Sequence, residues 1–132
     1  MKKTPLLHAA LSRLIATLGH GDMVLVADAG MPMPRDGRVE WIDLALTPGT
    51  PSLAATLAAL ISEMQVESHI IATETLARED LWIDGLKTLP IGTRRVVSHA
   101  ELKQISAQAR AFIRTGECTP YANLMLVAGV TF

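Results

Sequence analysis

The chain has 132 residues, of which 49% are hydrophobic and 19% charged, and its formal net charge is −1 at pH 7. The length fits one domain over residues 1–132, and the composition is that of a globular protein. A near-neutral charge without a basic run excludes the usual electrostatic pattern of a nucleic-acid-binding protein. No apolar run approaches the roughly 20 residues that cross a bilayer. We therefore expect a cytoplasmic domain that binds neither nucleic acid nor membranes.

The apolar residues are mainly aliphatic, since the chain has only two Trp, one Tyr and two Phe. With a mean hydropathy of +0.30, this is more apolar surface than a lone small domain usually needs. We expect part of it to lie between copies in a homo-oligomer. Cys118 is the single cysteine, which leaves no internal disulfide and is typical of a reducing compartment.

The N-terminal part of the chain predicts a helix followed by a buried strand. Apolar residues recur at three- and four-residue steps from Leu6 to Leu18, as on one face of a helix, and Gly19 is placed to end it in the left-handed conformation. Residues 23–27 form a continuous apolar run that is too short for a helix and typical of a strand buried on both faces. A loop rich in Gly and Pro follows over 29–38.

The middle of the chain begins with a short predicted strand over 41–46. Thr50 then resembles an N-cap with Pro51 at the first helical position, which predicts a helix to about Glu63. Alternation and β-branched residues predict another strand over 65–72.

The C-terminal part continues the alternation of helices and strands. Short helical turns are predicted over 74–89. Three strands are predicted over 94–97, 111–113 and 124–130. Ser98, with Glu101 three residues later, has the spacing of a capping box and predicts a helix to about Ala109. The pattern indicates the α/β class: a single layered domain with a mixed or parallel β-sheet flanked by helices.

One residue before the 23–27 strand and one residue after it are candidates for a catalytic or binding role. Asp28 follows the strand directly, and ligands of α/β sheets tend to bind beyond the carboxyl ends of strands. The same carboxylate is also suited to capping its own loop. His20 stands between Gly19 and Gly21, which leave the imidazole uncrowded, and histidine exchanges protons near neutral pH. A surface turn is the equally valid structural interpretation of His20.

Further candidates lie near the ends of other predicted strands. His99 follows the 94–97 strand and is expected at the same edge of the sheet as Asp28, although it equally fits an ordinary surface position. Tyr121 and Asn123 precede the last strand and offer a hydroxyl, an amide and a flat ring, which suit a polyhydroxylated ligand or simply a turn.

Other classes of site have weaker support. His8 and His69 fit structural positions, and the histidines have no metal-ligand spacing, so we expect no metal. No Gly-x-Ser-x-Gly elbow, Gly-x-Gly-x-x-Gly or Walker sequence occurs, which leaves a nucleophilic triad and a nucleotide cofactor unsupported. We interpret Cys118 as a bystander.

Six stretches, spread over nearly the whole chain, resemble one family of sugar isomerases. They are Leu-Gly-His-Gly-Asp (18–22), Ala-Asp-Ala-Gly-Met-Pro-Met-Pro (27–34), Ile-Asp-Leu-Ala-Leu-Thr (42–47), Glu-Met-Gln-Val-Glu (63–67), Gly-Glu-Cys-Thr-Pro-Tyr-Ala-Asn (116–123) and Ala-Gly-Val-Thr-Phe (128–132). Together they resemble the D-ribose pyranase family, whose relatives include fucose mutarotase. The 27–34 loop and the 63–67 segment resemble the ribose branch in particular.

The resemblance implies interconversion of the pyranose and furanose forms of D-ribose in ribose catabolism, without a cofactor. It implies that His20 transfers the proton and that Asp28, His99, Tyr121 and Asn123 are sugar-binding positions. It also implies a ring-shaped homo-oligomer, an octamer or a decamer, with sites near subunit contacts.

The chemistry fits these residues, because opening and reclosing a cyclic hemiacetal needs only proton transfers, which a positioned imidazole accelerates. We therefore hypothesise that His20 moves the proton while Asp28 and His99 hold sugar hydroxyls and tune the imidazole. Three alternatives stay open: a mutarotase for fucose or another sugar, a non-catalytic sugar-binding module, and a structural oligomer whose histidines are incidental.

Overall fold

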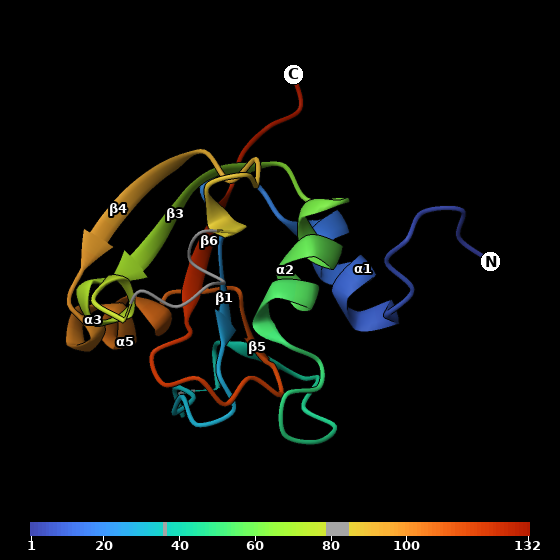
Figure 1. Cartoon of the computed structure of the whole chain (residues 1–132). Helices are drawn as coiled ribbons and strands as arrows, with labels where there is room; N and C mark the ends of the chain where they lie inside the picture. The colour runs from blue at the N-terminus through green and yellow to red at the C-terminus, as the bar shows by residue number, and fades with distance from the viewer. Residues whose placement is uncertain (36, 79–84) are drawn as a thin grey trace.

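The computed structural model describes residues 1–35, 37–78 and 85–132, and its strands form one mixed sheet (Figure 1). The order across the sheet is β2-β5-β1-β6-β3-β4. The strands are β1 (Met23–Ala27), β2 (Glu40–Asp43), β3 (Val66–Ala72), β4 (Thr93–Val97), β5 (Ala111–Arg114) and β6 (Leu124–Ala128). Strand β6 is antiparallel to both neighbours, β1 and β3, whereas the other pairs are parallel.

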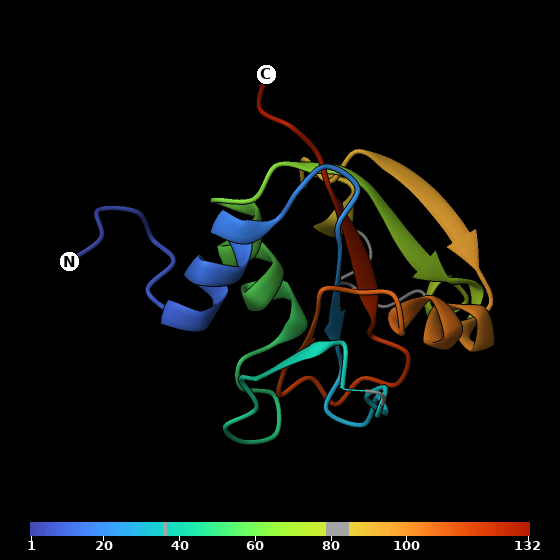
Figure 2. The same cartoon turned by 180° about the vertical axis from the view of Figure 1, so that it is seen from behind.

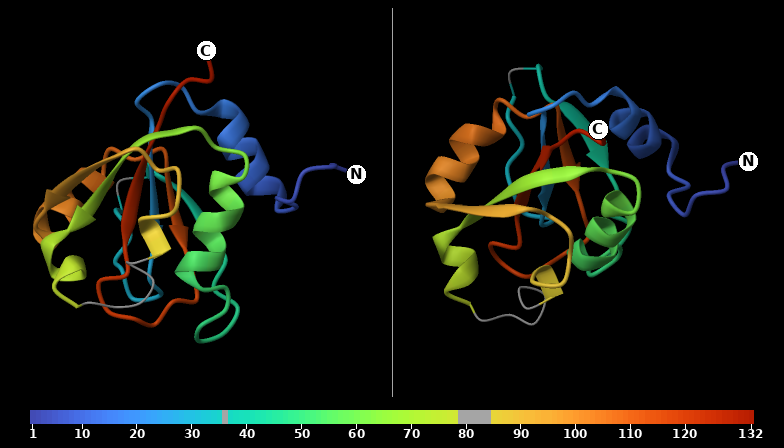
Figure 3. Two further views of the ribbon diagram at one scale, coloured as in Figure 1. Left: turned by 45° about the horizontal axis from the view of Figure 1, so that its top comes forward. Right: turned by 90° about the horizontal axis from the view of Figure 1, so that it is seen from above.

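Helices cover both faces of this sheet, as Figures 2 and 3 show from behind and from above. They are α1 (Ala9–Thr17), α2 (Leu53–Ile61), α3 (Thr73–Leu76) and α5 (His99–Ser106). Leu14 of α1 and Leu57 of α2 pack against Val24 and Val26 on one face. Leu102 of α5 packs with Leu25 and Phe112 on the other face. The α/β class, the mixed sheet and a strand β1 buried on both sides are therefore confirmed.

The first helix ends differently from the prediction. Leu18 is already extended, with φ −70° and ψ 133°, and Gly21 rather than Gly19 adopts a positive φ, of 81°. The reason is the side chain of Asp22, whose Oδ2 accepts the Gly19 N–H at 2.8 Å while its own N–H bonds to the Gly19 carbonyl. Asp22 thus closes the turn by its hydrogen bonds to Gly19, and the residue with a positive φ is Gly21, two positions after the predicted one.

The second helix starts two residues later than predicted. Ser52 is the N-cap, and its hydroxyl accepts the Ala55 N–H at 3.1 Å. Thr50 instead closes a tight turn by donating its N–H to the Thr47 carbonyl, and Pro51 precedes the cap rather than opening the helix. The assignment of Thr50 and Pro51 as N-cap and first helical residue is therefore wrong.

Other bounds differ by a few residues. The 41–46 strand is observed over Glu40–Asp43 and the 124–130 strand over Leu124–Ala128. The predicted Ser98 cap is confirmed by the hydrogen bond that its hydroxyl accepts from Glu101, but the Glu101 carboxylate pairs with Arg95. Helical turns predicted over 74–89 are observed at both ends of that span, and residues 79–84 lie outside the described residues.

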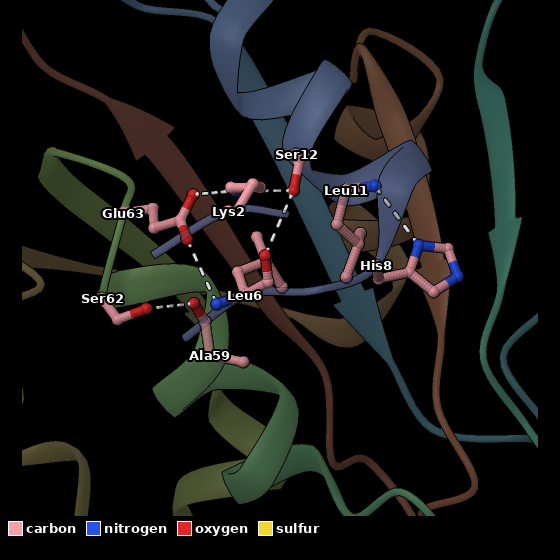
Figure 4. Close-up of polar contacts among 8 residues, drawn as sticks. All are labelled: Lys2, Leu6, His8, Leu11, Ser12, Ala59, Ser62 and Glu63. Carbon is pink, nitrogen blue, oxygen red and sulfur yellow. Dashed lines mark hydrogen bonds and ion pairs between the residues drawn. The ribbon is translucent and has the colours of Figure 1, made fainter. Parts of the chain in front are cut away.

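The N-terminal segment is fixed to the helical layer by one carboxylate (Figure 4). Glu63 accepts hydrogen bonds from the Lys2 ammonium at 2.7 Å and from the Leu6 N–H at 3.1 Å. The bond from Lys2 is the main cause that lowers the pKa of Glu63. His8 caps α1 by accepting the Leu11 N–H at its Nδ1. His8 is thus structural, as predicted.

Within the described residues, the helices are too short or too polar to cross a membrane.

Candidate functional site

The candidate residues lie at opposite ends of β1. His20 precedes the strand and Asp28 follows it. Five extended residues at about 3.3 Å each separate the two ends by about 17 Å. Within one chain, His20 therefore faces a different hollow from the one beside Asp28. We call these the His20 hollow and the Asp28 hollow.

The His20 hollow is open and mainly apolar. It lies between α1, the 63–65 segment and the C-terminal residues 128–132, with Ile15, Leu18 and Met64 on its wall. The turn that carries His20 is fixed because the Gly21 N–H bonds to the Ala128 carbonyl at 2.9 Å.

The His20 imidazole itself makes one polar contact among the described residues. Its Nε2 lies 2.5 Å from Oε2 of Glu67, and the two side chains are 62% and 54% exposed. The imidazole thus has open space on one side and a carboxylate on the other, which is the arrangement that a proton-transferring histidine needs.

The Asp28 hollow is built around a buried pair. Asn123 accepts the Asp28 N–H at 3.0 Å and donates its side-chain N–H to Asp28 Oδ2 at 2.9 Å. The other carboxylate oxygen accepts the Gly30 N–H. Asp28 is 9% exposed and Asn123 fully buried, so Asn123 acts on the site by holding the Asp28 carboxylate in place.

His99 and Tyr121 form the wall opposite Asp28. Their rings meet edge to face with centroids 5.0 Å apart, and the expectation that His99 faces the same edge of the sheet as Asp28 is confirmed. Burial, reinforced by the charge of Lys103, lowers the pKa of His99, although Glu74 and Asp28 act in the opposite direction. At neutral pH the His99 ring is therefore uncharged and offers one donor and one acceptor nitrogen.

The Nδ1 atom of His99 is buried without a hydrogen-bond partner in the described part of the chain. A buried nitrogen of this kind is costly unless something bonds to it.

Tyr121 is held in an unusual backbone conformation, with φ 63°. Non-glycine residues in this region cost energy and cluster at binding sites. The Tyr121 carbonyl compensates by accepting hydrogen bonds from the Thr75 hydroxyl and the Asn123 N–H. The tyrosine ring is consequently fixed beside His99 while remaining 40% exposed.

Sequence reasoning missed two residues that line the Asp28 hollow and one, Glu67, that contacts His20. Lys103 lines the Asp28 hollow one helical turn after His99, a four-residue spacing that the sequence displays. Glu117 lines the same hollow and bonds to Leu53, Cys118 and Thr119. Burial raises the pKa of Glu117, but these hydrogen bonds outweigh it and leave the pKa lowered. Glu67, the third, belongs to the 63–67 segment but lies far from His20 in sequence.

The remaining histidine is structural, as predicted. His69 is buried, donates from Nδ1 to the Ile91 carbonyl at 3.0 Å and accepts from Arg94 at Nε2. Among the residues that the structure describes, no three His, Cys, Asp or Glu side chains gather to hold a metal ion.

Open hollows with acid–base and hydroxyl side chains at the ends of strands are typical of α/β proteins that bind small polar molecules. The chain belongs to the RbsD / FucU transport protein family, whose model matches residues 1–131.

Two curated relatives illustrate the similarity within this family. The D-ribose pyranases of Pseudomonas fluorescens (strain SBW25) and Variovorax paradoxus (strain S110) are each 54% identical to the chain, over 136 and 138 aligned residues. Both comparisons cover 100% of each chain.

Solved structures agree with this assignment. The structure of Bacillus subtilis RbsD complexed with D-ribose matches with a TM-score of 0.93 and 45% identity, covering 100% of both chains. The fucose mutarotase of Streptococcus pneumoniae, in complex with L-fucose, shares the fold with a TM-score of 0.77 and 21% identity, again over 100% of both chains.

Proposed function

We propose that this protein is a D-ribose pyranase, an isomerase that interconverts the pyranose and furanose forms of D-ribose in ribose catabolism. The observation that carries the proposal is the full-length identity of 54% to curated D-ribose pyranases. It is supported by the match to a solved relative that holds D-ribose.

The reaction divides into a ring opening and a ring closure. A base removes the proton of the anomeric hydroxyl, the electrons of that O–H bond form the carbonyl, and the ring C–O bond breaks toward the ring oxygen, which takes up a proton. Attack by a different hydroxyl then forms the other ring. We assign the proton transfers to His20, because its imidazole is exposed and an imidazole carries one nitrogen that donates and one that accepts a proton.

The sugar hydroxyls are assigned to the Asp28 hollow. Asp28 accepts hydrogen bonds from hydroxyls, and the His99 ring, which lines the same hollow, contributes a further polar group. Tyr121 offers its ring face and hydroxyl, while Asn123 contributes by orienting Asp28. Lys103, on the same wall, adds a donor for a sugar oxygen.

These two assignments require a homo-oligomer. Since β1 separates the His20 and Asp28 hollows by about 17 Å within one chain, a sugar reaches both only where two copies meet. We infer that the His20 hollow of one subunit faces the Asp28 hollow of its neighbour, in a ring such as an octamer or a decamer. Residues 1–132 then act as one cytoplasmic sugar-isomerase domain that uses no cofactor.

The test is the exchange between ribose ring forms, measured by NMR saturation transfer. We expect the protein to accelerate exchange and His20→Ala to lower the acceleration by about 10²–10⁴-fold. Ribose binding without acceleration would identify a non-catalytic sugar-binding module, and faster exchange of fucose anomers than of ribose forms would identify a fucose mutarotase. Full activity of His20→Ala would remove His20 from the mechanism.

A further inference from the structure

We propose that Glu67 is the positioning residue for His20, placed by a β-bulge so that its carboxylate holds the imidazole with Nδ1 free for the sugar. The inference rests on the proposed function, because it assigns Glu67 a part in the same proton transfer. Its starting observation is the 2.5 Å contact between Glu67 Oε2 and His20 Nε2.

Glu67 is the extra residue of a bulge in β3. Val66 pairs with Ala128 and Ser68 with Val127, so two steps along β3 match one step along β6. The packing of β3 side chains in the hydrophobic core agrees with a bulge at Glu67. Val66 and Ile71 lie in the same hydrophobic cluster, although positions an odd number apart face opposite sides of a regular strand. A bulge turns a side chain out of the regular alternation and is common beside functional sites.

Two glycines make room for the bulge. A Cβ on Gly92 would lie 1.7 Å from the Glu67 carbonyl oxygen, and Gly92 has a φ of 63°. A Cβ on Gly129 would lie 3.1 Å from the Glu67 Cβ. The Glu67 backbone therefore packs closely against two positions that carry no Cβ, and its side chain extends to His20.

Strand β6 explains why these two residues meet. It lies between β1 and β3, and at its end the Ala128 carbonyl accepts the Gly21 N–H while the Gly129 N–H bonds to the Gln65 carbonyl. The turn before β1 and the start of β3 are thus fixed to one short segment. Their side chains reach each other across a position, 129, that carries no side chain.

The contact has a chemical consequence for His20. A carboxylate only accepts hydrogen bonds, so the nitrogen that faces Glu67 must carry the hydrogen. In the neutral ring, Nδ1 then carries the lone pair and takes the proton from the anomeric hydroxyl. The same carboxylate stabilises the imidazolium formed at that moment, which is the role of the carboxylate behind the histidine in other proton-transfer sites.

The experiment combines kinetics with a spectroscopic measurement of the ring. In Glu67→Gln the amide both donates and accepts, so the preference for one ring nitrogen is lost. We expect kcat for ribose exchange to fall about tenfold or more with KM unchanged, because Glu67 touches no sugar. We also expect the ¹⁵N shifts of His20 to move from those of a single tautomer toward an average. His20→Ala assigns these signals by their disappearance.

Glu101→Gln is the matched control, since it removes the same charge from another exposed, ion-paired carboxylate. We expect it to leave both measurements unchanged. Unchanged ¹⁵N shifts in folded Glu67→Gln, or a kcat equal to that of the control, would overturn the proposal. If the unmodified protein fails to accelerate exchange, the proposed function fails and the catalytic role of Glu67 fails with it. The ¹⁵N shifts then still decide whether Glu67 selects the tautomer.

Discussion

The two ends of β1 are built in opposite ways. At one end, Asp28 and Asn123 are buried and joined by reciprocal hydrogen bonds, and Tyr121 is fixed beside them. At the other end, His20 and Glu67 are more than half exposed and share one contact. The difference fits the arrangement proposed above, in which the Asp28 end is organised within one chain and the His20 end is completed by a neighbouring subunit.

The largest expected effect tests whether the two ends act across subunits. His20→Ala and Asp28→Asn should each lose most of the acceleration of exchange when prepared alone, because each variant has only one intact half-site. When the two variants are unfolded together and refolded as a mixture, contacts that join an intact His20 end to an intact Asp28 end should restore part of the activity.

NMR exchange rates of the separate and the mixed samples check this prediction. Size-exclusion chromatography verifies that each sample assembles. A mixture as inactive as its components would place both residues' roles within one chain and contradict the arrangement proposed above.

A smaller effect tests how firmly the Asp28 end is organised. Asn123→Ala leaves the Asp28 N–H and carboxylate without their partner in a buried position. We expect a loss of about 2–3 kcal/mol in the free energy of unfolding, since unsatisfied buried polar groups are costly, together with a higher KM for ribose.

Urea denaturation measures the first quantity, and Ser62→Ala is the control. The Ser62 hydroxyl donates one exposed hydrogen bond to the Ala59 carbonyl (Figure 4), so its loss should cost less than about 0.5 kcal/mol. Equal destabilisation by the two variants would show that the Asp28–Asn123 pair is no more important than a surface contact.

The smallest effect concerns pH. Burial is the main cause that lowers the pKa of His99 and of His69 from the usual value of 6.5. Below pH 6.5 the unfolded chain therefore binds protons that the folded chain does not, so stability should decrease as the pH falls from 7 toward 5. Lys103 supports the shift at His99, and Glu74 and Asp28 oppose it.

The free energy of unfolding, measured by urea denaturation between pH 5 and 8, should fall less steeply with acid in His99→Gln than in the unmodified protein. His69 accounts for part of the remaining dependence. An unchanged slope in His99→Gln would mean that the Asp28 end does not exclude water from that ring.

Local patterns predicted most of the fold, because burial on one or both faces leaves a clear periodicity. The 23–27 strand and the Ser98 cap are examples. The turn at Gly19 was mispredicted because it depends on a side chain three residues later, Asp22. The bulge at Glu67 was not predicted because an extra residue is defined only by its partner strand.

The candidate site shows the same division. Residue type and position pointed to His20, Asp28 and His99, and the structure brings Asp28 and His99 together. The separation of His20 from Asp28 follows from the strand between them, since eight positions that include an extended segment cannot fold back on themselves. The proposal that a second copy of the chain bridges this separation goes beyond what the position of any single residue in the sequence defines.

Strand β6 runs against its neighbours, so it leads from Asn123 at one functional end to Gly129 at the other. Deleting one residue inside β6 would move the side chains on one side of the deletion to the opposite face of the sheet. It would also shorten the distance between Tyr121 and the Ala128 carbonyl that accepts the Gly21 N–H. Insertions and deletions in this strand should therefore be far less tolerated than in the 29–38 loop.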